Sequence, residues 1–213
     1  MESINGYSWS ILPGLPGTGP RPVQFCAPEG DAHREGFVVA FDGPSSWCGN
    51  FPSGNHSYDH VFDTVLAHPS GELVIVVAGG TAYVVEPHSR ALIREFGWRI
   101  NIIIERDDPK IIIFGNDTEF YAVRADGNDW QSRRLSLDGM RNISADSSTL
   151  TGEAWEPIDN WYPFKVNLLT GAATGGSYVE QNDPHARNDT PVRRWYHFFQ
   201  RRKKKTPTCS QRF

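Results

Sequence analysis

Residues 73–85 read LVIVVAGGTAYVV, and this stretch decides the fold. Two runs rich in β-branched and aromatic residues flank Gly79 and Gly80, a pair that tolerates the positive φ angles of a tight hairpin turn. A second turn is expected over 86–89, because Pro87 lacks the N–H that a continuing strand would donate. A third strand follows over 90–96, so the sequence predicts a three-stranded antiparallel meander.

Other segments carry the same alternation of short strands and turns: 35–51 in part, 110–137 and 149–171. Tyr83, Tyr121 and Phe164 fall at matching points of the copies, 38 and then 43 residues apart. A period near 40 residues with several strands per copy is typical of β-propeller blades. Both faces of the strands at Tyr83 and Tyr121 carry apolar groups, so these strands are expected between two layers, with the tyrosines in the core.

Residues 76–96 also resemble one blade of the quinoprotein-like and WD-type β-propeller repeats, with a glycine hairpin, an aromatic strand and an apolar last strand. Residues 166–171, VNLLTG, are similar to the Asp-x-x-Thr-Gly turn of those repeats. The spacing of strands and turns, together with this resemblance, predicts an all-β fold of antiparallel meanders in a partial or small propeller. Weak repeats of this kind also occur in a β-sandwich, which is the alternative. About three and a half copies are fewer than the four or more blades of a closed ring. No cofactor is expected, and the quinone site of the family is not carried over.

Composition divides the chain into three parts. A Pro/Gly-rich N-terminal arm is expected over 1–34, a β-meander repeat domain over 35–185 and a basic, aromatic C-terminal tail over 186–213. Residues 1–185 hold 12 Lys and Arg against 24 Asp and Glu, whereas the tail holds 9 against 1, which gives the net charge of −4. An acidic body repels nucleic-acid phosphates, so any nucleic-acid or membrane contact is expected at the tail.

The sequence has no recognisable export or catalytic signature. The first residues lack the basic start and apolar run of a secretion signal, and no segment approaches the ~20 apolar residues of a membrane span. A cytoplasmic location is therefore expected, with Cys26, Cys48 and Cys209 as reduced thiols. The carboxylates at 107–108 and 126–129 are expected to bond backbone amides in turns, and no Gly-x-Ser-x-Gly elbow or phosphate loop is present.

The hairpin expected over 153–161 is the candidate protein interface, because it places two indoles among three acidic groups. Its residues are Glu153, Trp155, Glu156, Asp159 and Trp161. Tryptophan offers a large contact area at little entropic cost, which makes it a frequent interface anchor. The alternative is that both indoles fill the core between sheets.

A polar cluster at 55–60 is the candidate metal site. His56, Asp59 and His60 would converge on one ion if the segment were helical. In an extended chain the two imidazoles would lie about 13 Å apart, and the flanking residues favour a loop, so a solvated turn is the simpler interpretation. A metal-dependent hydrolase that uses these three residues remains the alternative function.

The tail flanks aromatic residues with basic clusters, a composition suited to an anionic membrane surface or to nucleic-acid phosphates. The residues concerned are Arg193, Arg194, Trp195, Arg201, Arg202, Lys203, Lys204 and Lys205. A disordered solubilising end and packing of the tail aromatics on the acidic body are the alternatives.

These observations favour a non-catalytic protein-interaction module with an acidic binding surface, of the immunity or adaptor type. A basic protein is the expected partner, because charge complementarity steers association. A second copy of the chain is another expected partner, since unpaired strand edges of a half-ring invite association.

Overall fold

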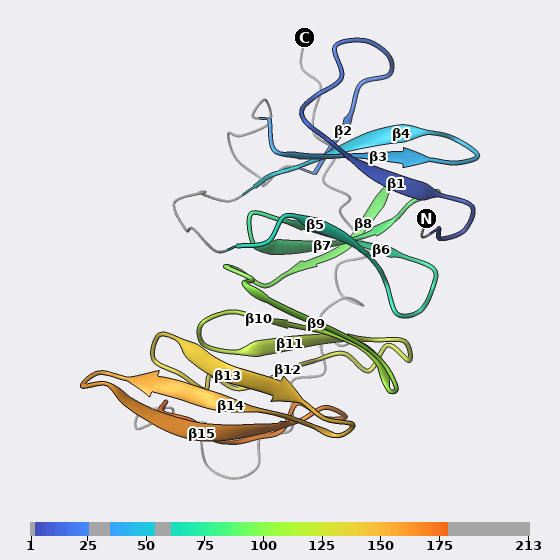
Figure 1. Ribbon diagram of the computed structural model, residues 1–213. Coiled ribbons are helices and arrows are strands. Elements are labelled where there is room, and N and C mark those ends of the chain that lie inside the picture. Colours follow the sequence, from blue (N-terminus) through green and yellow to red (C-terminus); the bar gives the residue numbers. More distant parts are fainter. Residues whose placement is uncertain (1–2, 26–34, 54–60, 179–213) are drawn as a thin grey trace, which may run out of the picture.

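A computed structural model of the protein describes residues 3–25, 35–53 and 61–178. The strands in these ranges form four four-stranded sheets, numbered 1 to 4 in chain order (Figure 1). The same ranges contain no helix, and hence none long and apolar enough to cross a bilayer. The prediction of an all-β fold built from antiparallel meanders is confirmed.

Sheets 2, 3 and 4 are simple meanders in which every neighbouring pair of strands is antiparallel. Sheet 2 comprises β5 (Thr64–Ala67), β6 (Val74–Ala78), β7 (Thr81–Glu86) and β8 (Ala91–Phe96). Sheet 3 comprises β9 (Ile102–Asp107), β10 (Lys110–Gly115), β11 (Phe120–Arg124) and β12 (Trp130–Gln131). Sheet 4 comprises β13 (Met140–Ala145), β14 (Thr149–Glu156), β15 (Asn160–Asn167) and β16 (Ala173–Gly175).

Sheet 1 departs from the meander order. In space it runs β1 (Ser8–Leu12), β3 (Phe37–Asp42), β4 (Trp47–Phe51) and β2 (Val23–Gln24). β1 pairs antiparallel with β3, whereas β2 runs parallel to β4. Both β1 and β2 lie within the range expected to form the arm, so that range supplies two strands of a sheet.

The sequence prediction missed the first strand of each of these three meanders. The Gly79-Gly80 hairpin is confirmed, with Ala78 opposite Thr81 and positive φ at both glycines. However, β5, β9 and β13 precede the predicted strands of sheets 2, 3 and 4. The strand expected over 130–137 is limited to β12, because beyond it the Ser132 hydroxyl accepts the N–H of Phe120 at 3.0 Å.

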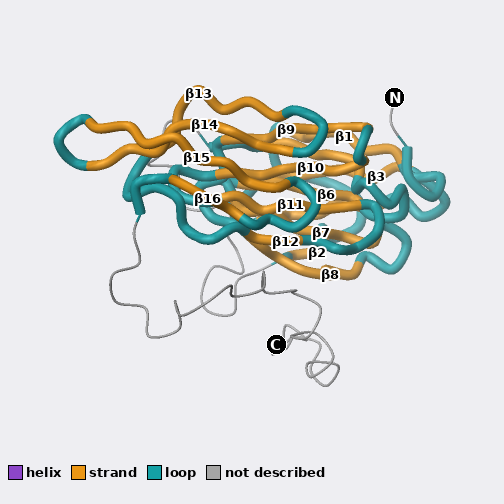
Figure 2. Tube along the Cα trace, turned by 90° about the horizontal axis from the view of Figure 1, so that it is seen from below, coloured by secondary structure: helices purple, strands orange, loops and turns teal. Residues whose placement is uncertain are grey.

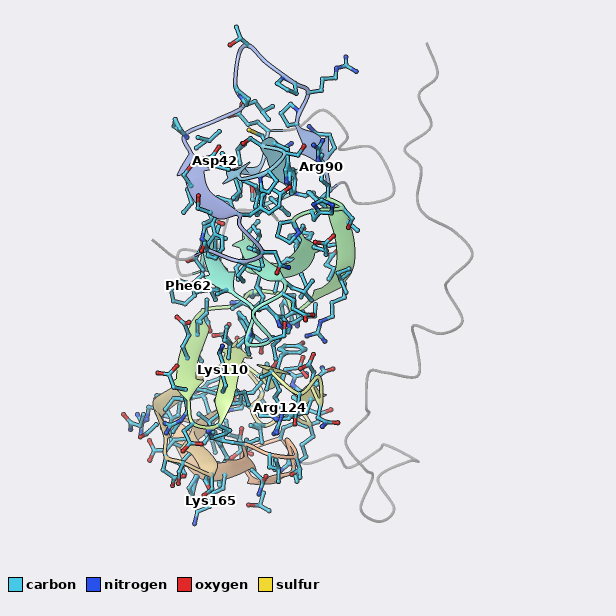
Figure 3. The ribbon with its side chains drawn as sticks, turned by 90° about the vertical axis from the view of Figure 1, so that its right-hand side faces the viewer. Asp42, Phe62, Arg90, Lys110, Arg124 and Lys165 are labelled. Atoms are coloured by element: carbon cyan, nitrogen blue, oxygen red, sulfur yellow. The ribbon has the colours of Figure 1, made fainter. Side chains whose placement is uncertain are left out.

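The sheets pack face to face in a row, with sheets 1 and 4 at its two ends (Figures 1 and 3). One cluster of buried apolar side chains fills each gap between neighbours. Tyr83 lies in the cluster between sheets 1 and 2, Tyr121 between sheets 2 and 3, and Phe164 between sheets 3 and 4. The repeat positions identified in the sequence are therefore equivalent core positions, and the prediction that both tyrosines are buried is confirmed.

Sheet 4 ends the row with one face that no described sheet covers (Figure 1). Exposed and buried residues alternate along β15, and Phe164 and Val166 point into the core toward sheet 3. Alternation places Thr151, Glu153 and Lys165 on the opposite, outward face. By contrast β11 in sheet 3 is buried along its whole length. The same alternation places Trp155 and Trp161 on this outward face, and no other described sheet covers it, so the described sheets form an open row (Figure 1).

Sheets 1, 2 and 3 each have a side-chain donor that reaches the next sheet. In every case the acceptor residue lies between the third and fourth strands, in chain order, of the accepting sheet. The three pairs are Trp47 Nε1 with the Pro87 carbonyl at 3.0 Å, Arg94 with the Asp129 carboxylate, and Trp130 Nε1 with the Leu168 carbonyl at 2.8 Å. This repeated contact holds neighbouring sheets in a fixed relation, because a buried acceptor left unpaired would be costly.

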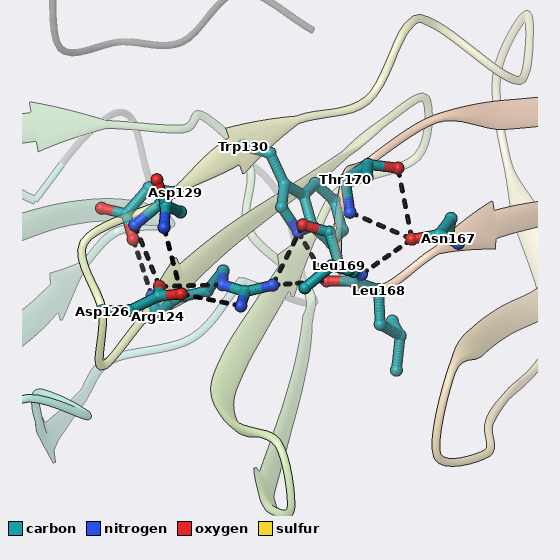
Figure 4. Close-up of polar contacts among 9 residues, drawn as sticks. Arg124, Asp126, Asp129, Trp130, Asn167, Leu168, Leu169 and Thr170 are labelled. Atoms are coloured by element: carbon teal, nitrogen blue, oxygen red, sulfur yellow. Dashed lines mark hydrogen bonds and ion pairs between the residues drawn. The ribbon is translucent and has the colours of Figure 1, made fainter.

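Arg124 adds to the contact between sheets 3 and 4 (Figure 4). Its Nη1 donates to the Leu169 carbonyl at 3.0 Å, while Nε and Nη2 donate to Asp126 at 3.0 and 2.9 Å. These bonds hold the pKa of Asp126 well below its usual range. Asp129 accepts the backbone N–H of Arg124 at 2.6 Å, and burial raises its pKa. Asp126 also accepts the backbone N–H of Asn128 at 3.0 Å, so both carboxylates bond backbone amides near this turn, as the sequence predicted.

Candidate functional site

The hairpin formed by β14 and β15 is the candidate functional site, and it extends beyond the other loops of the described chain (Figure 2). Trp155 lies directly opposite Trp161, and Glu156 lies opposite Asn160, so three residues form the tip. Both indoles are partly buried, whereas all three tip residues are exposed. The hairpin expected over 153–161 is therefore confirmed, and the register adds that its two indoles face each other across the strands.

The backbone at the tip adopts a conformation that its residues do not favour. Proline at 157 suits the second position of a type II turn, whose third position needs positive φ and normally holds glycine. Here Ile158 occupies that position with φ of 84°, and Asp159 follows with φ of 57°. Aspartate tolerates this region, but a β-branched residue there is an outlier that costs about 1–2 kcal/mol.

The side chain of Ile158 is hardly buried by the rest of the fold. It is 87% exposed, the highest value among the large apolar side chains of the described chain. Neither packing nor burial therefore compensates the strained backbone in this protein alone. Residues held in sparsely populated φ regions cluster at ligand-binding and switch sites, which makes Ile158 a candidate contact residue.

The base of the hairpin, unlike its tip, is held by polar contacts. Arg141 Nε donates to Glu153 Oε2 at 2.8 Å, and the Arg141 guanidinium carbon lies 3.9 Å from the centre of the Trp161 ring. Asn142 Nδ2 donates to the same carboxylate oxygen at 2.9 Å. These bonds lower the pKa of Glu153, so Glu153 is a charge-compensated support rather than a free acidic contact.

Backbone contacts anchor the point where β14 leaves the sheet body. The N–H of Trp155 donates to the Gly139 carbonyl at 3.0 Å and to Ser136 Oγ at 3.1 Å. The Trp155 carbonyl accepts from the hydroxyls of Ser136 and Ser177. Further out, Tyr162 is 41% exposed and bonds Glu156 through its hydroxyl, which raises the pKa of Tyr162. The result is a hairpin with a fixed base and an exposed apolar and acidic tip.

The structure thus brings the predicted interface residues Glu153, Trp155, Glu156, Asp159 and Trp161 onto one hairpin. It gives them different surroundings: Glu153 bonds Arg141, while Asp159 is exposed at the tip. Ile158 and Arg141 were missed by the sequence interpretation. The Pro-Ile pair at the centre of a short turn was the available signal, because isoleucine is unusual where a turn of this length needs positive φ.

The other predicted sites lie outside the described residues. This applies to His56, Asp59 and His60, and to the tail residues Arg193, Arg194, Trp195, Arg201, Arg202, Lys203, Lys204 and Lys205. Among residues 3–25, 35–53 and 61–178, no three His, Cys, Asp or Glu side chains are grouped so that they could hold a metal ion.

Comparison with known proteins adds little to this description. No protein-family model matches the chain, and no curated protein matches it. A solved structure described as the crystal structure of the eukaryotic initiation factor is similar over 68% of this chain and 40% of that chain. The two share 11% sequence identity with a TM-score of 0.36, and the chain spans about two fifths of that protein's length. A likeness at this TM-score supports no inference about function.

Proposed function

We propose that the protein is a non-catalytic protein-interaction module that binds a partner through the tip of the β14–β15 hairpin. The observation that carries the proposal is Ile158, which is 87% exposed at a φ of 84°. No contact within the fold offsets the conformational strain at this residue. Insertion into an apolar pocket of a partner would stabilise the complex by about 1.5–3 kcal/mol, since this is the free energy gained by burying an isoleucine side chain fully.

The surroundings of Ile158 support a basic rim on the partner's pocket. Glu156 and Asp159 flank it in sequence, and the chain up to residue 185 carries twice as many acidic as basic residues. Opposite charges around an apolar anchor raise the association rate and exclude wrong partners. An immunity-type or adaptor role fits such a surface, because both depend on binding without chemistry.

The open row of meanders supports the same proposal. We take the four sheets to be propeller-type blade repeats, in which a rigid β scaffold carries binding residues on its loops and hairpins. The fixed base of the hairpin limits the entropy lost on binding, because only the tip needs to be ordered.

Site-specific photo-crosslinking in cells tests the proposal. A photo-reactive amino acid is placed at position 158 and, as a matched control, at Ser147, an exposed turn residue at the other end of β14. The proposal predicts that position 158 crosslinks to one protein rich in lysine and arginine, identified by mass spectrometry, and that position 147 does not. Equal labelling from both positions, or no protein product from 158, would contradict it.

The alternative functions of the sequence interpretation stay predictions. A hydrolase built on His56, Asp59 and His60 predicts a bound metal ion that is lost in His56→Ala. Attachment through the tail predicts that deletion of residues 193–213 abolishes binding to anionic liposomes or to oligonucleotides.

A further inference from the structure

A cleft of about 430 Å³ lies between sheets 2 and 3, and none of its lining residues belongs to the β14–β15 hairpin. One wall is the end of β5 at Ala67 with His68 and Pro69 of the turn that follows, and the other is the β9–β10 hairpin. Ile4 closes one side. The volume lies within the range of small-molecule sites, and the lining combines apolar with charged side chains.

His68 supplies a hydrogen-bond donor at this cleft. It is 7% exposed, and its Nδ1 accepts the N–H of Ser70 at 3.1 Å, which places the ring proton on Nε2. Burial, together with the positive charges of Arg94 and Lys110, lowers the pKa of His68 to about 4. At neutral pH the ring is therefore an uncharged N–H donor in a region of positive potential. Within the described chain no hydrogen bond from Nε2 is found, so this donor is free for a ligand.

The β9–β10 hairpin brings charges of both signs to the cleft. Asp107 lies opposite Lys110 and Glu105 lies opposite Ile112, so all four residues share the face that packs toward sheet 2. Among the described residues no ion pair engages the side chains of Glu105, Asp107 or Lys110. The cleft thus offers unpaired groups for an anion and for a cation a short distance apart.

We propose that this cleft binds a zwitterionic ligand of the short-peptide class, with its carboxylate on Lys110 and His68 and its ammonium on Glu105 and Asp107. Ile4, Ala67 and Ile112 provide the apolar wall for its side chains. A single-charge ligand fits less well, because it would leave either the ammonium or the carboxylates of the hairpin unpaired beside it. The cleft exceeds the volume of one amino acid, which favours a dipeptide with apolar side chains.

NMR titration of the full chain with the dipeptide leucyl-leucine tests the assignment. We expect chemical-shift changes confined to amides of residues 67–71 and 105–112. N-acetyl-leucyl-leucine lacks the ammonium and leucyl-leucine amide lacks the carboxylate, so each should bind at least about tenfold more weakly, as expected for loss of a charge-assisted contact.

Two variants separate the cleft from general charge effects. Lys110→Met should weaken leucyl-leucine binding at least about tenfold, whereas Lys165→Met, which removes an exposed lysine from the outer face of sheet 4, should leave it unchanged. An unchanged amide spectrum outside the cleft shows that each variant is folded. The assignment is overturned if leucyl-leucine causes no shifts in the cleft, if the blocked forms bind equally well, or if both variants behave alike.

Discussion

Replacing Ile158 with glycine measures the strain at the hairpin tip directly. An L-residue at a φ of 84° is less stable there than glycine by about 1–2 kcal/mol. Glycine also stabilises the unfolded chain by about 0.5–1 kcal/mol through its larger conformational freedom, which offsets part of this gain in stability. The side chain is 87% exposed, so its removal costs almost no burial. Ile158→Gly should therefore raise the free energy of unfolding by about 0.5–1 kcal/mol.

Guanidinium unfolding followed by tryptophan fluorescence gives this free energy, and a melting curve should show a rise of about 2 °C in Tm. Ile158→Ala is the matched control. It removes the exposed side chain but keeps the Cβ that opposes positive φ, so it should lie within about 0.5 kcal/mol of the wild type. If the Ile158→Gly variant is less stable than both the wild type and Ile158→Ala, the tip is not strained. The physical argument that Ile158 takes part in binding then fails.

Three further outcomes are expected. Trp130→Phe removes the bond to the Leu168 carbonyl between sheets 3 and 4 and should lower the free energy of unfolding by about 1–3 kcal/mol, whereas Trp98→Phe, at a half-exposed position, should change it by less than about 0.5. Gly171→Ala should cost at least about 1–3 kcal/mol, since φ is 72° and an added Cβ would lie 2.7 Å from the Trp130 ring; chemical denaturation measures both effects. The pKa of His68 is about 4 in the folded protein and 6.5 in the unfolded chain, so the unfolded chain binds a proton first as pH falls. The free energy of unfolding should therefore fall by up to about 3 kcal/mol between pH 6.5 and pH 4. Urea unfolding across this pH range measures the decline, which should be smaller in His68→Asn.

Local signals predicted much of the fold. Gly79 and Gly80 identify a hairpin because both need positive φ, and neighbouring apolar runs identify its strands. The equivalence of Tyr83, Tyr121 and Phe164 follows from spacing alone and gives the core of three successive sheet pairs. These features are encoded within short stretches, so pairing partners far away in sequence are not needed to see them.

Features that depend on distant partners were missed. β1 and β2 come from a segment rich in proline and glycine, and they are strands only because β3 and β4 present free edges to them. β9 is partly exposed and lies at the edge of its sheet, so it lacks the clear pattern of a core strand. The end of β12 depends on a side-chain bond from Ser132, which no propensity predicts.

The sequence identified the residues of the candidate site but not their contacts or the backbone conformation of the tip. Trp155 and Trp161 were recognised as a pair, and the register places them opposite each other. The ion pair between Arg141 and Glu153 could not be predicted, because it depends on the register of β13 against β14. That register is irregular after Arg141. Ile158 lies in the predicted turn, but its positive φ contradicts its own propensity, so the strain at this position could not be predicted from the sequence.

The most direct test of the interaction role compares affinity and stability in the same variant. The protein captured by crosslinking at position 158 is purified, and its Kd is measured for the wild type and for Ile158→Gly by calorimetry. Loss of a buried isoleucine anchor should raise Kd at least about tenfold while the folded chain becomes more stable. An unchanged Kd in the stabilised variant would show that the hairpin tip does not carry binding.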